Sequence, residues 1–149
     1  MIGLKKYAPA IVALLSVFCL DRLTKQWVLS GGIPFLLNRG MCFGACSLWS
    51  CGPIISIVCA VVWISVLIGG VYVLGKRGYG VLPLALVIGG ALSNLVDRIL
   101  FGGVVDFIDI TIPIPWYGPF SWAPFNVADV AIVAGAVWFV CMELFTNRK

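Results

Sequence analysis

Residues that could perform acid–base chemistry lie in four clusters, and three of the four contain aspartate. The clusters are Asp21 with Lys25, Asn38 with Gly40, Asn94 with Asp97 and Arg98, and Asp106 with Asn126 and Asp129. The chain has no histidine, which excludes nucleophilic catalysis of the Ser-His or Cys-His kind. Two aspartates within hydrogen-bonding distance cannot both ionise easily, so one keeps its proton near neutral pH. Such a pair can activate a water molecule and protonate a leaving amine.

Asp106 is the acid whose surroundings most favour catalysis. It lies between Val105 and Phe107, in an apolar stretch with no adjacent base. Apolar surroundings raise the pKa of a carboxyl group, as a catalytic acid requires. From the chemistry alone Asp129 is the best partner for Asp106. The alternative is structural, because Asn126 and Asp129 also have the spacing of a helix N-cap and its capping-box acid.

The other charged clusters also have structural interpretations. Asp21 and Lys25 are one helical turn apart and can form a neutralising ion pair, with a supporting role at a site still open. Asn94, Asp97 and Arg98 share one face of a helix, where they can cap its end and hold a loop. Because an adjacent arginine favours the ionised form of Asp97, that acid is poorly suited to sharing a proton.

Composition determines which kind of fold must position these residues. The 149-residue chain is 62% hydrophobic and only 11% charged, with a mean hydropathy of +1.10. Soluble domains carry about 25% charged residues, so a soluble globule is excluded. Disorder and nucleic-acid binding are excluded as well, since ten bases and six acids leave little electrostatic footprint. We expect one integral membrane domain over residues 1–149.

Four apolar segments predict an all-α membrane protein with spans at residues 7–29, 53–74, 81–100 and 126–145. The uncharged part of the first, Tyr7–Leu20, would be about 21 Å long as a helix, short of the ~30 Å hydrocarbon core. The helix must therefore continue through Asp21 and Lys25. Ionisable groups at membrane depth cost about 2.5–3.5 kcal/mol and mark a functional site by default.

The distribution of charge predicts the orientation. With a cytoplasmic N-terminus, six of the ten bases lie on the inner side: Lys5, Lys6, Lys76, Arg77, Arg148 and Lys149. The positive-inside rule then places both termini in the cytoplasm, and five of the six acids gather near the outer leaflet. An alternative function is a small proton-coupled transporter or a non-enzymatic four-span partner protein. That alternative predicts acids along a path through the membrane, and their crowding on one side argues against it.

Two external loops, residues 30–52 and 101–125, complete the predicted fold. Alternation from Val104 to Ile112 predicts an extended segment, and the second loop is rich in proline and aromatic residues, which suits the headgroup region. We expect residues 30–50 and 101–124 to form a small β-like cradle. Cys42, Cys46 and Cys51 share the first loop without a histidine or a Cys-x-x-Cys pair, so a zinc site is not expected. Their redox state stays open.

Five motifs, in order along nearly the whole chain, closely resemble those of lipoprotein signal peptidase (signal peptidase II), the aspartyl intramembrane protease family of bacteria. Any one motif is weak, but all five together are highly specific. They are Asp21-Arg22-Leu23-Thr24-Lys25; Asn38-Arg39-Gly40-Met41-Cys42-Phe43-Gly44; Gly89-Gly90 with Asn94, Asp97 and Arg98; Val104-Val105-Asp106-Phe107; and Phe125-Asn126-Val127-Ala128-Asp129. The chain departs from the family at two positions, with Cys42 in place of the usual alanine and Ser93 where glycine is common.

The resemblance implies that Asp106 and Asp129 form a catalytic dyad. It implies that Asn38, Asn94, Arg98 and Asn126 line the site and that Asp21 and Lys25 support it. The implied substrate is a prolipoprotein whose cysteine already carries diacylglycerol, cut before that cysteine in the bacterial cytoplasmic membrane. We expect a monomer in contact with membrane lipid, with no metal, no cofactor and no nucleic acid.

Overall fold

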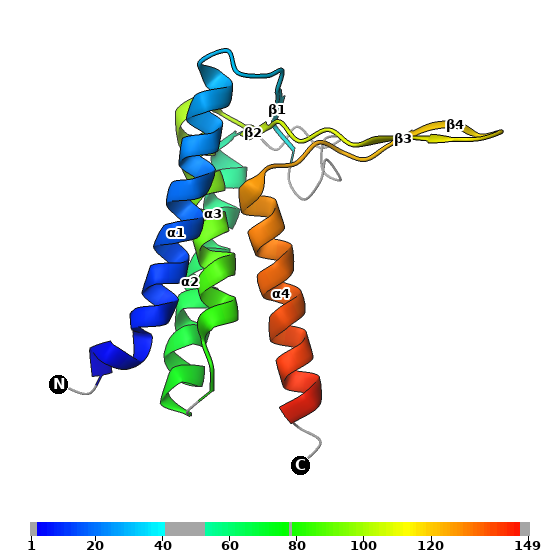
Figure 1. Ribbon diagram of the computed structural model, residues 1–149. Coiled ribbons are helices and arrows are strands. Elements are labelled where there is room, and N and C mark those ends of the chain that lie inside the picture. The colour runs from blue at the N-terminus through cyan, green and yellow to red at the C-terminus, as the bar shows by residue number, and fades with distance from the viewer. Residues whose placement is uncertain (1–2, 41–52, 78, 147–149) are drawn as a thin grey trace.

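The computed structural model describes residues 3–40, 53–77 and 79–146 and consists mainly of four long helices (Figure 1). Their bounds are α1 Gly3–Leu29, α2 Pro53–Lys76, α3 Leu82–Phe101 and α4 Val127–Thr146. All four are long and apolar enough to cross a membrane, and two small antiparallel sheets accompany them. The predicted fold class is therefore confirmed. The main difference at the helix ends is that α1 begins at Gly3 rather than at residue 7.

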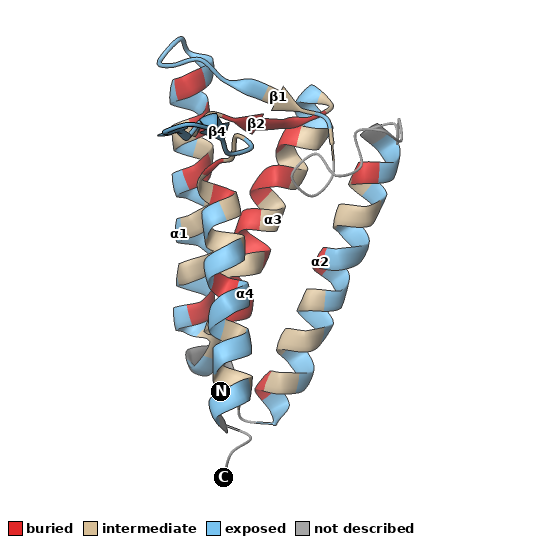
Figure 2. Cartoon of the chain, turned by 90° about the vertical axis from the view of Figure 1, so that its right-hand side faces the viewer, coloured by how far each residue is buried: buried red, intermediate tan, exposed pale blue. Residues whose placement is uncertain are grey.

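Helix α3 is the centre of the bundle. It contacts α1, α2 and α4. In its most apolar 18-residue stretch, 44% of the residues are buried, whereas the corresponding share in the other three helices is 6–11%. Figure 2 shows buried positions along α3 and mostly exposed positions on the outer faces of the other helices. A soluble protein would hide such apolar faces, whereas in a bilayer lipid tails cover them.

Adjacent glycines let α3 approach two helices closely. A Cβ atom on Gly89 would lie 2.6 Å from the carbonyl oxygen of Leu14 in α1, and one on Gly90 would lie 2.5 Å from that of Ala128 in α4. Both distances are too short for real atoms, so any larger residue would push the helices apart. Small residues at helix contacts allow this kind of close packing in membranes. The two glycines therefore bring α1 and α4 together around the middle of α3.

Strand β1 (Leu36–Asn38) pairs with strand β2 (Val104–Asp106) across one end of the bundle. The strands are antiparallel, with Leu36 opposite Asp106 and Asn38 opposite Val104. All three residues of β2 are buried. In Figure 1 this sheet lies at the end opposite to that where α1 begins and α4 ends. The pairing brings the segment between α1 and α2 next to Asp106.

Strands β3 (Thr111–Ile114) and β4 (Gly118–Ser121) form a hairpin. It belongs to a longer segment, residues 107–125, which we call the hairpin arm and which extends sideways from the bundle (Figure 1). Trp116 and Tyr117, in the turn between the strands, are 98% and 91% exposed. The predicted cradle thus consists, in the described residues, of two separate sheets. Cys42, Cys46 and Cys51 lie outside the described residues.

Candidate active site

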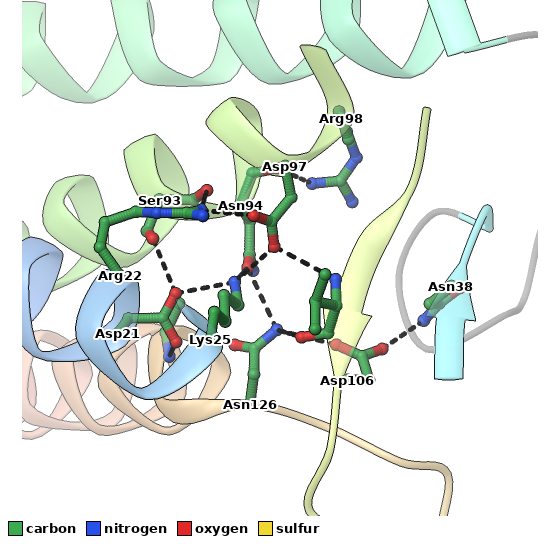
Figure 3. A network of polar contacts seen from close by, with 12 residues as sticks. Asp21, Arg22, Lys25, Asn38, Ser93, Asn94, Asp97, Arg98, Asp106 and Asn126 are labelled. Atoms are coloured by element: carbon green, nitrogen blue, oxygen red, sulfur yellow. Dashed lines mark hydrogen bonds and ion pairs between the residues drawn. The ribbon is translucent and has the colours of Figure 1, made fainter. Parts of the chain in front are cut away.

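A buried ion network around Lys25 forms the base of the site (Figure 3). The Lys25 ammonium lies 2.7 Å from Asp21 Oδ2 and 2.8 Å from Asp97 Oδ2, and it donates to Asn94 Oδ1 at 2.8 Å. The side chains of Lys25, Asp21 and Asp97 are fully buried. The predicted ion pair between Asp21 and Lys25 is confirmed, and a second carboxylate from α3 joins it.

The two carboxylates of this network hold other elements in place. Asp21 Oδ1 accepts the backbone N–H of Ala128, in the first turn of α4, at 2.8 Å. Asp97 Oδ2 accepts the backbone N–H of Val105, in β2, at 3.1 Å. The first bond joins residues 107 positions apart in the chain, whereas the second ties α3 to the strand that follows it. The interpretation of Asp97 as a residue that holds a loop is therefore confirmed.

Two residues of the network were missed by the sequence interpretation. Arg22 forms an ion pair with Asp97 Oδ1 and also donates to the Ser93 carbonyl at 3.3 Å. The Ser93 hydroxyl donates to Asp21 Oδ2 at 2.7 Å. Arg22 was detectable as an ionisable residue at membrane depth. Ser93 was noted only as a departure from the family.

The sequence suggested Arg98, the next residue in the chain, as the cation beside Asp97, but the ion pairs that the structure describes involve α1. The ion pairs described for Asp97 are with Arg22 and Lys25 of α1, whereas Arg98 donates to the carbonyl of Asn94 at 3.2 Å. Residues adjacent on a helix point in directions about 100° apart. Asp97 therefore faces α1 from its side of α3.

Asp129 is held by two asparagines. Asn94 Nδ2 donates to Asp129 Oδ1 at 2.9 Å, and the backbone N–H of Asn126 donates to Asp129 Oδ2 at 3.2 Å. In return, Asn126 Oδ1 accepts the backbone N–H of Asp129 at 3.0 Å. This reciprocal pair confirms the predicted capping box. Because Lys25 takes the oxygen of Asn94, the amide nitrogen of Asn94 is left to point at Asp129.

Asp106 is held in a similar way from two sides. Asn126 Nδ2 donates to Asp106 Oδ1 at 2.8 Å, and Asn38 Nδ2 donates to Asp106 Oδ2 at 2.9 Å. Asn38 is itself oriented by the backbone N–H of Gly40, which donates to Asn38 Oδ1 at 2.9 Å. Asn126 thus contacts both aspartates. Its side-chain nitrogen binds Asp106, and its backbone N–H and its side-chain oxygen bind Asp129. Figure 3 shows Asn38 and Asn126 on opposite sides of Asp106.

Both aspartates line one cavity of about 250 Å³ between α2, α3, α4 and the strands. Asn38, Gly40, Asn94 and Arg98 line the same cavity. The remaining candidates lie in the supporting network: Asp21, Lys25, Asp97 and Asn126. Within residues 3–40, 53–77 and 79–146, no three His, Cys, Asp or Glu side chains are grouped as a metal site requires.

Burial gives Asp106 the acidity that proton exchange near neutral pH needs. Removal from water raises the pKa of Asp106 from 3.8 to about 6, against the opposing effect of the hydrogen bond from Asn38. The negative charge of Asp129 raises it further. A carboxyl group with this pKa can both hold and release a proton under physiological conditions.

The raised pKa of Asp106 predicts a pH dependence of stability. Between pH 3.8 and about 6 the folded protein binds this proton while the unfolded chain releases it, so this contribution to stability is full below pH 3.8 and lost as pH rises through 6. Asp106→Asn removes the titrating group. We expect the melting temperature of the wild type, relative to that of Asp106→Asn, to be higher at pH 4.5 than at pH 7.5. Thermal unfolding at both pH values tests this, and a pH-independent difference would contradict it.

Known proteins similar to this chain agree on one family. A family profile described as signal peptidase (SPase) II matches residues 13–145. A lipoprotein signal peptidase of Anaplasma marginale (strain Florida) is 31% identical over 98% of this chain and 90% of its own length. Another, from Anaplasma phagocytophilum (strain HZ), is 32% identical over 95% of each chain.

A solved structure described as a bacterial membrane enzyme has the same fold. It is 25% identical, with a TM-score of 0.73 over 94% of this chain and 91% of its own. The profile and the relatives confirm the resemblance found in the motifs, and the fold agrees with them. This four-span chain therefore belongs to the signal peptidase II family, and it is an aspartic-type protease of the bacterial inner membrane.

Proposed function

We propose that Asp106 and Asp129 are the catalytic dyad of this signal peptidase and that its substrates are diacylglyceryl-modified prolipoproteins. The observation that carries the proposal is the shared cavity, which both residues line. Amide donors hold each group in place from the protein side. A carboxyl oxygen has about two lone-pair sites, so each aspartate still has the capacity to contact a water molecule or a peptide bond.

The dyad would act by general acid–base catalysis. One carboxylate takes a proton from water as the water oxygen attacks the carbonyl carbon of the scissile bond. The other, protonated, gives its proton to the amide nitrogen as the carbon–nitrogen bond breaks. The products are a new carboxyl end on the signal peptide and a free amino group on the lipidated cysteine. The two groups titrate as a coupled pair, and their roles exchange during the reaction.

The other site residues would bind or support. Asn38, Gly40, Asn94 and Arg98, which line the cavity, would hold the substrate extended around the scissile bond, since a helical peptide bond is shielded from attack. Asp21, Lys25, Asp97 and the fully buried Asn126 would keep Asn94, the two aspartates and strand β2 in position. The chain would work as a monomer with one peptidase domain over residues 1–149.

The membrane orientation follows from charge and from the position of the site. Lys6, Lys76 and Arg77 lie near the ends of α1 and α2 that are remote from β2, which the positive-inside rule assigns to the cytoplasm. Both termini would then be cytoplasmic and the dyad would lie near the outer leaflet. The signal helix of the substrate would lie between the spans. The buried acids gather in one network rather than along a path through the bundle, which does not favour a transporter.

The proposal is tested with the purified chain and two forms of one precursor peptide, with and without diacylglycerol on the cysteine. We expect cleavage before the cysteine in the lipidated form, detected by mass spectrometry as a new N-terminal lipidated cysteine. The unmodified form should stay intact. Equal cleavage of both forms, or cleavage elsewhere, would refute the proposed substrate class.

A further inference from the structure

A second, apolar groove lies beside the dyad. It has a volume of about 380 Å³ and runs between the hairpin arm and the outer part of α4. We call it the arm groove. Its walls include Ile110, Ile112, Phe120 and Trp122 of the arm and Val130 and Val133 of α4. The surface inside it is almost entirely apolar, so its occupant must be apolar too.

The arm groove adjoins the catalytic cavity. Asp129 and Val133 line both spaces. One end of a group bound in the groove therefore lies in contact with Asp129. The proposed reaction cuts the bond directly before the lipidated cysteine, and neighbouring Cα atoms are about 3.8 Å apart. The lipid on that cysteine must consequently leave the catalytic cavity through a space adjoining the dyad.

The dimensions and exposure of the arm groove suit a long apolar chain. A cavity of about 150 Å³ is enough for one benzene ring, so about 380 Å³ is more than a single peptide side chain needs. The residues Ile112, Trp122 and Val130 in its walls are 53%, 54% and 52% exposed. The groove therefore lies at the surface of the molecule, where a chain bound in it can continue into the surrounding lipid.

Aromatic rings stiffen the wall formed by the arm. Phe120 and Trp122 contact edge to face, with ring centroids 6.2 Å apart and planes at 71°. The backbone N–H of Trp122 donates to the Ile110 carbonyl at 2.9 Å, which continues the hairpin pairing toward the bundle. A stiff wall orients a flexible chain at a lower entropic cost than a loose one.

We propose that the arm groove binds an acyl chain of the diacylglyceryl group on the substrate cysteine. This inference rests on the proposed function and adds a subsite for the lipid. An acyl chain that moves from bilayer to groove exchanges one apolar environment for another. Binding in the groove therefore depends on van der Waals contacts along the acyl chain, which hold the lipidated cysteine near the dyad. Loss of these contacts should raise KM more than it lowers kcat.

The test uses one precursor peptide whose cysteine carries either dipalmitoylglyceryl or dibutyrylglyceryl. The full chain is assayed in vesicles of fixed phosphatidylethanolamine and phosphatidylglycerol content. For Trp122→Ala we expect KM for the dipalmitoyl peptide to rise about 5-fold or more, with kcat and the dibutyryl KM within about 2-fold of wild type. For each peptide, KM of the variant is divided by KM of the wild type. This ratio cancels the difference between the two peptides in partitioning into the vesicles.

Two further variants make the outcome specific. Trp116→Ala removes the same residue type from the exposed hairpin turn, outside the arm groove, and should change neither KM. Val130→Phe fills the groove from the α4 side without altering the hairpin and should raise KM for the dipalmitoyl peptide alone. Equal changes for both peptides, as expected if a bilayer lipid or a peptide side chain occupied the groove, would overturn the acyl site. Unchanged KM in both groove variants would also overturn it. A wild type that cleaves neither lipidated peptide would instead overturn the proposed function, and the acyl site with it.

Discussion

Replacing either Asp106 or Asp129 by asparagine is expected to lower kcat/KM for the lipidated precursor by about 10³-fold or more. Asparagine keeps the size of aspartate but can neither take a proton from water nor give one to the leaving nitrogen. As a proposed dyad the two aspartates would act as a unit, so the double variant should lose little beyond either single variant. Initial rates of cleavage, measured at matched protein concentration in the same vesicles, check this.

A nearby acid provides the matched control for the dyad variants. Asp109 lies three residues after Asp106 in the chain, is exposed, and does not line the catalytic cavity. Asp109→Asn should therefore cleave at the wild-type rate. Near-normal cleavage by Asp106→Asn or Asp129→Asn, with folded and membrane-inserted protein, would show that the dyad assignment is wrong.

Folding of the dyad variants has to be measured separately. Asp106 accepts side-chain amide donors on both oxygens, and an asparagine in its place has one acceptor oxygen. Asp106→Asn therefore loses one hydrogen bond, a cost of about 1 kcal/mol, unless Asn38 turns its amide. A loss of that size leaves the protein folded, so a 10³-fold loss of rate cannot be explained by unfolding.

Lys25→Met is expected to destabilise the protein by about 3–5 kcal/mol, the loss typical when one partner of a buried ion pair is removed. Asp97 keeps its ion pair with Arg22. Asp21 is left buried with the neutral donors Ser93 and Ala128, which compensate its charge less well than an ammonium group. The free energy of unfolding, from denaturant titration of the purified protein in mixed micelles, measures the loss.

A second lysine and a second substitution make this prediction specific. Lys76 in α2 is exposed, with its ammonium 4.4 Å from the ring centre of Tyr72, so Lys76→Met should cost at most about 1 kcal/mol. Adding Asp21→Asn to Lys25→Met removes the uncompensated charge and should restore part of the stability. A double variant less stable than Lys25→Met would contradict the ion-network interpretation, as would a loss below about 1 kcal/mol in the single variant.

Much of the fold follows from local sequence. Four runs of apolar residues predict four spans, because each must satisfy its backbone hydrogen bonds internally in lipid. Two contacts in the site are equally local. Asp21 pairs with Lys25 at the spacing of one helical turn, and Asn126 and Asp129 close a capping box over three residues.

The same cap shows where local interpretation falls short. From the chemistry alone, the sequence allowed a structural or a catalytic role for Asp129, and only the family resemblance implied the catalytic one. In the fold Asp129 has both features, since it closes the cap and also lines the cavity together with Asp106. The close approach of α4 to α3 at Gly90 places the capped end of α4 beside the cavity. No pattern within a few residues of Asp129 encodes this approach of the two helices.

By itself, the sequence determined the class of protein, the number of spans and, through its motifs, the family, and it predicted which acids perform the chemistry. Only the tertiary structure decided which groups meet. Lys25 reaches Asp97 and Asn94 on α3, Asn38 reaches Asp106 across a strand pair, and Arg22 rather than the adjacent Arg98 forms the described arginine pair with Asp97. The reason is physical. Hydropathy and capping act within a few residues, whereas these contacts depend on how each helix is rotated and how closely its glycines let it approach its neighbours.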